Sequence, residues 1–330
     1  MKATFPLRGT RVRVVAAVVV LALVVSGCVG LAQKERELTF RVVRADAGWY
    51  SGMPEAVREL YLSVANGAAT ERIHAWWWPA ADPDAPALLY LHGARWNLTG
   101  HLNRISQLHD FGFSVFAIDY RGFGKSDGEL PSEESVYEDA RVGWAWLVAR
   151  QPAPARRFIY GHSLGGAVAV ELASDLAKGG PGAQGLIVES SFTSLADMAA
   201  EVTKGFLPAS LMLTQKFDSL GKIGQVRMPV LVVHGAQDRF VPPRFSEALH
   251  AAAPEPKKLL LVENGSHNNS MWVGNGEYQR AIVELFGLQT EALNGAAGTI
   301  VAPAPPAGAG RSVNRARGLG VLYSSTRETE

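Results

Sequence analysis

Cysteine is almost absent from this sequence, because Cys28 is the only one in 330 residues. A single cysteine excludes an internal disulfide, and its place near the N-terminus leaves no thiol for a metal site or a cysteine nucleophile in the rest of the chain. Net charge is also nearly absent: 32 Lys and Arg against 31 Asp and Glu give +1. Since the sequence contains no visible basic face, nothing in its electrostatics indicates nucleic-acid binding.

The sequence also lacks the spacing of metal and phosphate sites. No group of His, Cys, Asp and Glu has metal-ligand spacing, and the run from Gly161 to Gly166 carries a serine where a phosphate loop needs a lysine. We therefore expect no metal and no other cofactor. Hydrophobic residues make up 47% of the chain, which is typical of a globular protein. The length allows one large α/β domain or two smaller ones.

The N-terminus has the pattern of an export signal. Basic residues precede an apolar run over 14–25, which is too short to span a bilayer by itself and ends in Ser26-Gly27-Cys28. Residues 25–28 resemble the lipobox of bacterial lipoproteins, in which the signal is cut before the cysteine and that cysteine is diacylglycerated. The resemblance implies a signal peptide over 1–27 and a tether over 28–37. The protein would be lipid-anchored in the bacterial cell envelope, facing the periplasm or the exterior.

A second interpretation of the same residues is an uncleaved N-terminal membrane anchor, in which Cys28 is merely a small apolar residue. The position of Cys28, where the small-residue cleavage site belongs, favours the lipoprotein. Either interpretation holds the body of the protein at a membrane.

Strand and helix patterns alternate over residues 38–289, which we interpret as one domain. Strands are expected at 38–44, 60–64, 73–78, 87–91, 114–119, 158–160, 185–188, 230–233 and 258–262, and helices at 133–150, 166–178, 244–253 and 277–286. Antiparallel strands followed by strand-helix alternation predict an α/β fold with a mostly parallel, doubly wound sheet.

Two segments depart from this alternation. Residues 191–227 contain no strand pattern, and they fit equally a small lid over the carboxyl edge of the sheet or an ordinary connecting helix. Residues 290–330 are rich in Ala, Gly and Pro, a composition that cannot bury enough apolar surface to offset the entropy of ordering. We expect a disordered tail there.

The strongest chemical motif is Gly161-His162-Ser163-Leu164-Gly165-Gly166, which lies between a strand pattern and a helix pattern. In this context Gly-x-Ser-x-Gly indicates a sharp turn that exposes a nucleophilic serine at the end of a strand. The motif resembles that of the α/β-hydrolase superfamily, and the resemblance covers residues 60–288. It implies the α/β-hydrolase fold with a small helical lid.

The family's chain order of nucleophile, acid and histidine implies roles for two further residues. Asp238 follows the strand expected at 230–233, and His267 follows the one at 258–262. His267 would take the proton of Ser163, and Asp238 would orient the imidazole. Glu189 also follows an apolar strand and is the alternative acid.

Residues 87–95 resemble the family's strand followed by His-Gly-x. The resemblance implies that the backbone N–H groups of Ala94 and Leu164 form the oxyanion hole. The Trp76-Trp77-Trp78 run fits either a lipid-contacting patch or, preferably, a strand whose rings alternate between core and surface.

The sequence most resembles small-lid, membrane-associated hydrolases related to monoacylglycerol lipases. The resemblance implies hydrolysis of carboxylic esters through an acyl-enzyme on Ser163, with monoacylglycerols or lysophospholipids as substrates that suit a membrane location. A peptidase or acyltransferase using the same triad stays open, as does a non-catalytic member of the fold that binds a partner or lipid at the membrane.

Overall fold

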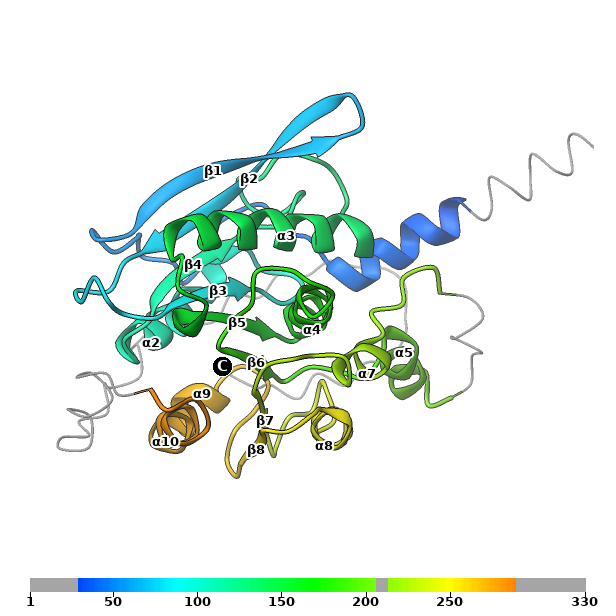
Figure 1. Cartoon of the computed structure of the whole chain (residues 1–330). Coiled ribbons are helices and arrows are strands. Elements are labelled where there is room, and N and C mark those ends of the chain that lie inside the picture. The colour runs from blue at the N-terminus through cyan, green and yellow to red at the C-terminus, as the bar shows by residue number, and fades with distance from the viewer. Residues whose placement is uncertain (1–28, 206–212, 289–330) are drawn as a thin grey trace, which may run out of the picture.

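The computed structural model describes residues 29–205 and 213–288. One sheet of eight strands, in the order β1-β2-β4-β3-β5-β6-β7-β8, organises them (Figure 1). β1 pairs antiparallel with β2 and β2 antiparallel with β4, whereas all other neighbours are parallel. The expected mostly parallel sheet is therefore confirmed. The strands are β1 (Arg58–Asn66), β2 (Ala69–Trp78), β3 (Ala87–Leu91), β4 (Ser114–Ile118), β5 (Arg157–His162), β6 (Gly185–Glu189), β7 (Val230–Gly235) and β8 (Lys257–Val262).

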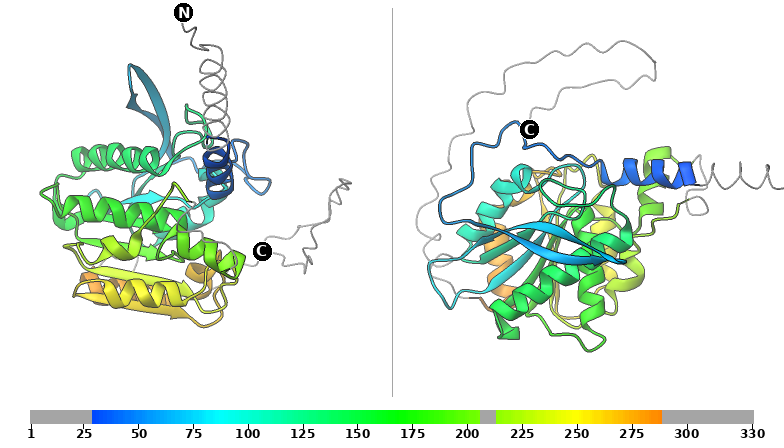
Figure 2. Two further views of the ribbon diagram at one scale, coloured as in Figure 1. Left: turned by 90° about the vertical axis from the view of Figure 1, so that its right-hand side faces the viewer. Right: turned by 90° about the horizontal axis from the view of Figure 1, so that it is seen from above.

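Helices cover both faces of the sheet and enclose two hydrophobic clusters (Figure 2). One cluster lies beneath α3 (Glu133–Arg150), α4 (Leu164–Leu176), α7 (Ser219–Ile223) and α8 (Arg244–Ala252). The other lies beneath α2 (Leu98–Asp110), α9 (Ser270–Val273) and α10 (Asn275–Phe286). The strands β3, β4, β5, β6 and β7 are buried along their whole length, because helices cover them on both sides.

Most of the expected strands and helices coincide with observed ones within a few residues. The strand expected at 38–44 is wrong: residues 29–40 are helical, and 41–44 have no regular structure. This N-terminal helix includes residues 29–37 of the expected tether, whose first residue, Cys28, lies outside the described residues. The tryptophan run lies in β2, where Trp76 and Trp77 are buried in opposite clusters. The run is therefore a strand, as expected, but the expected alternation between core and surface is wrong, because both faces of the strand are covered here.

The interval 191–227 contains α5 (Leu195–Thr203) and α7 and no strand among its described residues. α7 packs against α4 as a connecting helix does, whereas α5 has no buried residue. No helix in the described ranges is long and apolar enough to cross a membrane. The expected signal peptide and C-terminal tail lie outside the described residues.

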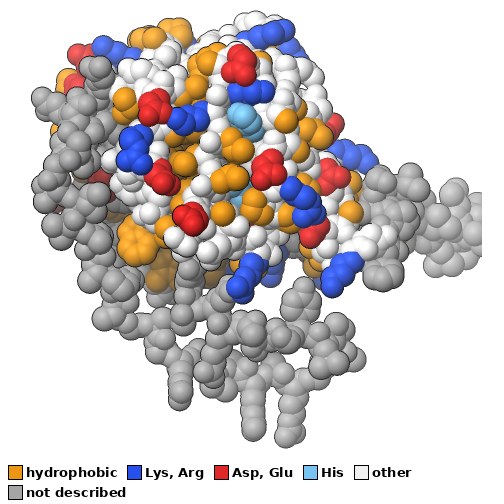
Figure 3. All heavy atoms as spheres, turned by 90° about the horizontal axis from the view of Figure 1, so that it is seen from below, with side chains coloured by type: hydrophobic (Ala, Val, Ile, Leu, Met, Phe, Trp, Pro, Cys, Tyr) orange, Lys and Arg blue, Asp and Glu red, His pale blue; other side chains and the backbone are white. Residues whose placement is uncertain are grey.

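β8 forms one edge of the sheet and is only partly buried. It begins with Lys257 and Lys258, and charged side chains on an edge strand discourage pairing with another chain. On the face below β8, basic and acidic side chains alternate with apolar ones (Figure 3). The surface there has mixed charge.

Candidate active site

Ser163 lies in a strained turn between β5 and α4. Its φ of 56° and ψ of −120° fall in a region that residues other than glycine rarely adopt. The turn requires two glycines, because a Cβ on Gly161 would overlap the carbonyl oxygen of Gly165 and a Cβ on Gly165 would overlap that of Leu91. The half-buried serine is therefore held at the carboxyl end of β5.

Asp238 follows β7, His267 follows β8, and their side chains meet: His267 Nδ1 lies 2.7 Å from Asp238 Oδ2. The backbone N–H groups of Phe240 and Val241 donate to Oδ1 at 2.8 and 2.9 Å. Burial alone would raise the pKa of Asp238, but hydrogen bonds from His234 and His267 outweigh burial and hold this pKa well below its ordinary value. An ionised Asp238 keeps the proton of His267 on Nδ1 and leaves Nε2 free to accept one.

The ring of His267 lies beside the ring of His162 in the serine turn, with 4.9 Å between the two ring centroids. Within the described ranges the Ser163 hydroxyl forms no hydrogen bond, so its link to His267 is open in this structure. Bonds between nucleophile and base are often long in free enzymes and tighten when substrate binds. The structure thus joins two of the three predicted triad residues directly.

Three hydrogen bonds to buried side chains hold the loop that carries His267. They join His162 Nε2 to the carbonyl of His267 at 2.9 Å, Arg104 Nη2 to the carbonyl of Asn268 at 3.1 Å, and the Ser270 hydroxyl to Glu189 Oε1 at 2.6 Å. Burial lowers the pKa of His162 well below its ordinary value, so this ring is neutral and donates from Nε2. Three buried groups therefore fix the position of the candidate base.

Glu189, the alternative acid, is fully buried and does not contact the His267 ring. Its carboxylate accepts from Arg104 at 3.2 Å and from the hydroxyls of Tyr160 and Tyr278 at 2.6 and 3.0 Å, besides Ser270. Burial would raise the pKa of Glu189, but the charge of Arg104 and these donors outweigh it and lower the pKa. Its backbone carbonyl accepts the N–H of Ser163 at 2.9 Å. Glu189 thus connects the serine turn to the histidine loop, and the geometry favours Asp238 as the acid.

The predicted oxyanion turn follows β3 and lies against the nucleophile. A Cβ on Gly93 would stand 3.2 Å from Cβ of Ser163. Leu164 begins α4, so its N–H has no acceptor within the helix, and the N–H of Ala94 has no backbone acceptor in the described part of the chain. Both N–H groups can therefore donate a hydrogen bond to an oxygen atom of a substrate.

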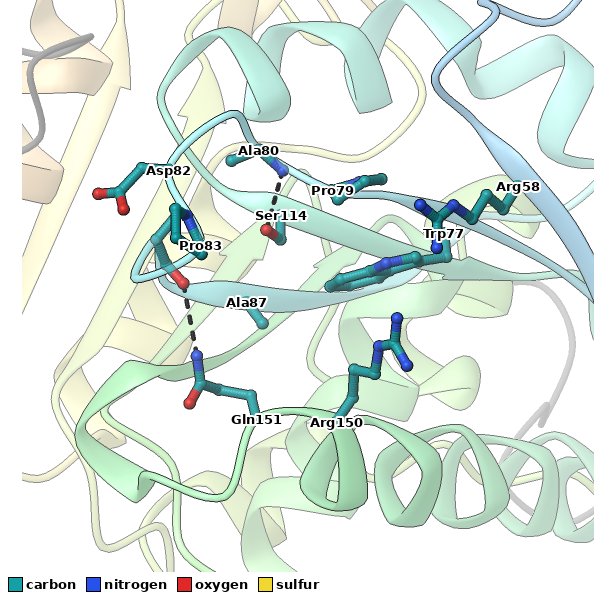
Figure 4. A pocket seen from close by; sticks show the side chains of 11 residues that line it. Arg58, Trp77, Pro79, Ala80, Asp82, Pro83, Ala87, Ser114, Arg150 and Gln151 are labelled. Carbon is teal, nitrogen blue, oxygen red and sulfur yellow. Dashed lines mark hydrogen bonds between the residues drawn. The ribbon is translucent and has the colours of Figure 1, made fainter.

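A cavity of about 210 Å³ lies elsewhere, at the amino ends of β3 and β4. Ala87 and Ser114, which begin β3 and β4, line it together with Arg58 and Arg150, whose side chains lie near Trp77 (Figure 4). Because the serine, aspartate and histidine all follow the carboxyl ends of strands, this cavity is separate from them. No group of three or more His, Cys, Asp and Glu in the described ranges is placed to hold a metal ion.

Sequence reasoning missed Arg104, because it missed the whole of α2. The buried face of that helix carries His101 and Arg104 beside Leu98, Ile105 and Leu108, so polar residues interrupt the apolar period on which a helix prediction rests. Asn97, which caps α2 by accepting from the N–H of Thr99, is the signal that could have located its start.

Comparison with known proteins places this geometry in a family. The model of the family described as serine aminopeptidase, S33, matches residues 82–223. The uncharacterized protein MT2364 of Mycobacterium tuberculosis is 34% identical over 262 residues, which are 78% of this chain and 90% of that protein. The alpha/beta hydrolase domain-containing protein WAV2 of Arabidopsis thaliana is 28% identical over 238 residues, 66% of this chain and 74% of WAV2.

The fold is also found among solved structures. The Pyrococcus furiosus esterase Pf2001 superimposes with a TM-score of 0.57 at 21% identity, over 74% of this chain and 98% of the esterase. That structure shares the arrangement of strands and helices described above. With a relative at 34% identity over nine tenths of its length, a matching family model and this fold, the chain belongs to the α/β-hydrolase superfamily.

Proposed function

We propose that the protein is a membrane-tethered serine hydrolase that cleaves carboxylic esters through an acyl-enzyme on Ser163. The observation that carries the proposal is the 2.7 Å contact between His267 and the ionised Asp238, above a serine held at positive φ. A non-catalytic binding protein would need neither feature. The esterase Pf2001 among proteins of the same fold is consistent with this chemistry.

In the proposed reaction the Ser163 oxygen attacks the ester carbonyl carbon while His267 Nε2 takes the hydroxyl proton. The carbonyl electrons move onto the oxygen, which the N–H groups of Ala94 and Leu164 stabilise. The C–O bond to the alcohol then breaks, and His267 returns the proton to the departing oxygen. Water repeats the sequence on the acyl-enzyme, which releases the carboxylic acid and restores the serine.

An exposed apolar side chain beside His267, and others in the helix α9 that follows it, favour an acyl chain as the part of the substrate that is recognised. Phe240 is 67% exposed, and its ring centroid lies 5.8 Å from that of His267. Trp272 and Val273, a few residues beyond His267, are also exposed. Large exposed apolar residues near a site are typical of a surface that binds an apolar ligand. We therefore propose monoacylglycerols or lysophospholipids as the substrate class.

A series of p-nitrophenyl esters of increasing chain length tests this proposal. We expect the purified protein to hydrolyse the octanoate with a higher kcat/KM than the acetate, since each buried methylene contributes about 0.8 kcal/mol. A marked preference for the acetate would contradict the lipid substrate. Absence of any turnover, together with no labelling by a fluorophosphonate, would contradict the proposal that the protein is a serine hydrolase.

The lowered pKa of Asp238 predicts how acid affects stability. Because the folded-state pKa lies below the ordinary value, the stabilisation from ionised Asp238 is complete above about pH 4 and is lost as the pH falls through the folded-state pKa. The difference in unfolding free energy between wild type and Asp238→Asn should be constant at neutral pH and shrink below about pH 4. Urea unfolding at a series of pH values measures it, and a difference that persists undiminished into acid would contradict the assignment.

Aminopeptidase activity is the second candidate, because the matching family model is described as serine aminopeptidase. The same attack on a peptide carbonyl would release an N-terminal amino acid. Amino acid p-nitroanilides, assayed beside the esters, separate the two. If a p-nitroanilide gives the higher kcat/KM, the peptidase replaces the esterase as the proposed function.

We further propose that Cys28 is lipidated and anchors the protein in the cell envelope. The helical residues 29–40 follow it in the chain and are joined to the body, since the N–H groups of Thr214 and Gln215 donate to the Glu35 carboxylate at 2.8 and 2.7 Å. Labelling of cells with a palmitate analogue should mark the wild type and not Cys28→Ala. Equal labelling of both would contradict the anchor.

A further inference from the structure

The residue that follows the predicted oxyanion turn has a strained backbone. Arg95 has a φ of 81°, a conformation that is unfavourable for a non-glycine residue and persists only where neighbouring structure imposes it. Its N–H donates to the carbonyl of Phe40 at 2.8 Å. The turn that carries Ala94 is therefore held by a segment from far upstream in the chain.

That segment, residues 40–45, has no regular structure of its own beyond the end of the N-terminal helix. We call it the arm. Its last three carbonyl groups face Asn97, which is 1% exposed and whose amide Nδ2 lies 3.3, 3.3 and 2.8 Å from the carbonyl oxygens of Val43, Arg44 and Ala45. One side chain thus contacts three successive carbonyl groups of the arm, and the carbonyl of Val43 also accepts the N–H of Gly124 at 3.4 Å.

The arm is also fixed at its start. The ring of Phe40 is fully buried and packs edge-on against Phe217 with 6.0 Å between centroids. Arg36, one turn earlier in the helix, donates to the carbonyl of Pro131 at 2.9 Å. The helix over residues 29–40, which spans about 18 Å, is therefore joined rigidly to the arm.

We propose that Asn97 is a positioning residue that holds the arm against the oxyanion turn, so that the membrane-proximal end of the chain is a working part of the active site. The proposal rests on the proposed function, because the oxyanion turn matters only to an enzyme that forms a tetrahedral intermediate. Asn97 acts through the arm and through Phe40 on the orientation of the Ala94 and Arg95 amides.

Two substitutions in the full-length protein separate the two functions of this side chain. Both Asn97→Asp and Asn97→Ser keep an oxygen that can cap α2, since Asp, Ser and Asn are equally good caps, but both lose the amide donor. The aspartate also turns an oxygen toward three carbonyl oxygens. Ser132→Ala, which removes the side-chain cap of α3, is the matched control for general destabilisation.

We expect both Asn97 variants to lose about 10–100-fold in kcat on p-nitrophenyl esters, a part of the 10²–10³ that one oxyanion donor supplies, with KM nearly unchanged. Affinity for a trifluoromethyl ketone, which forms a tetrahedral adduct with the serine, should fall in proportion. Ser132→Ala should change neither at a comparable loss of Tm. A kcat within twofold of wild type in both variants, or an equal loss in Ser132→Ala, would overturn the proposal.

Hydrogen–deuterium exchange gives a readout independent of catalysis. The amides of the peptide spanning residues 92–98 should exchange faster in both Asn97 variants than in wild type or Ser132→Ala. Unchanged exchange there would overturn the proposal even if activity fell. Failure of the proposed function is recognised separately, in the wild type: it would neither hydrolyse esters nor react with a fluorophosphonate, whatever the exchange rates of the variants.

Discussion

Replacing Ser163 by alanine should lower kcat for p-nitrophenyl esters by about 10⁶-fold, because the covalent route then has no nucleophile. The substitution adds no bulk at a half-buried position and relieves no contact in the turn, so Tm should change by only a few degrees. Steady-state kinetics on purified protein, with intact mass after fluorophosphonate treatment, measures the effect. The adduct should form on wild type and be absent from Ser163→Ala.

Ser174→Ala is the matched control for this loss. Ser174 lies on α4, the helix that begins directly after the nucleophile, and is buried, with its hydroxyl donating to Gln225 at 3.3 Å. The Ser174→Ala variant loses one hydroxyl from the same helix at a distance from the site. It should keep the kcat of the wild type and still form the fluorophosphonate adduct. Residual turnover of Ser163→Ala above a hundredth of wild type would show that another residue is the nucleophile.

Replacing Arg104 by methionine should lower both stability and turnover. Methionine keeps the apolar stem but removes the charge beside Glu189, and an unpaired buried carboxylate costs about 3–5 kcal/mol. The carbonyl of Asn268 also loses its donor, which frees the loop that carries His267. A displacement of the base of about 1 Å costs on the order of 10²-fold in rate, so we expect kcat to fall with little change in KM.

The double variant Arg104→Met/Glu189→Gln distinguishes these two effects. Because neither charge remains, unfolding by urea should show much of the lost stability regained relative to Arg104→Met. Turnover should stay low, since the carbonyl of Asn268 still has no partner. If kcat instead recovers together with stability, the loss in the single variant comes from a weakened fold, and Arg104 has no role in placing His267.

The central strands of the sheet were predictable because they are buried on both faces and therefore read as continuous apolar runs, such as Ala87–Leu91. The location of the site was predictable because each candidate catalytic residue directly follows a strand of the sheet. The order of strands brings Ser163, Asp238 and His267 to one edge without further information from side chains. Contact between Asp238 and His267, rather than between Glu189 and His267, required the structure.

What could not be predicted depends on buried polar side chains. Arg104 is an ordinary charged residue in the sequence, and Glu189 stands out there only as an alternative acid; burial beneath the histidine loop gives both their role. Residues 38–44 have the apolar content of a strand, yet the carbonyls of Val43 and Arg44 accept from the Asn97 side chain and not from a neighbouring strand. A local pattern cannot reveal a partner that lies more than fifty residues away.

The pairing of Arg104 with Glu189 has a consequence for how this protein can change over evolutionary time. Losing either charge alone leaves the other buried without an opposite charge, and the same carboxylate also accepts from Ser270. Lineages that abandon the pair must therefore pass through a poorly folded intermediate or exchange both residues almost at once. Positions 104 and 189 should covary among homologous sequences, with position 270 following position 189 more closely than it follows its own neighbours in the chain.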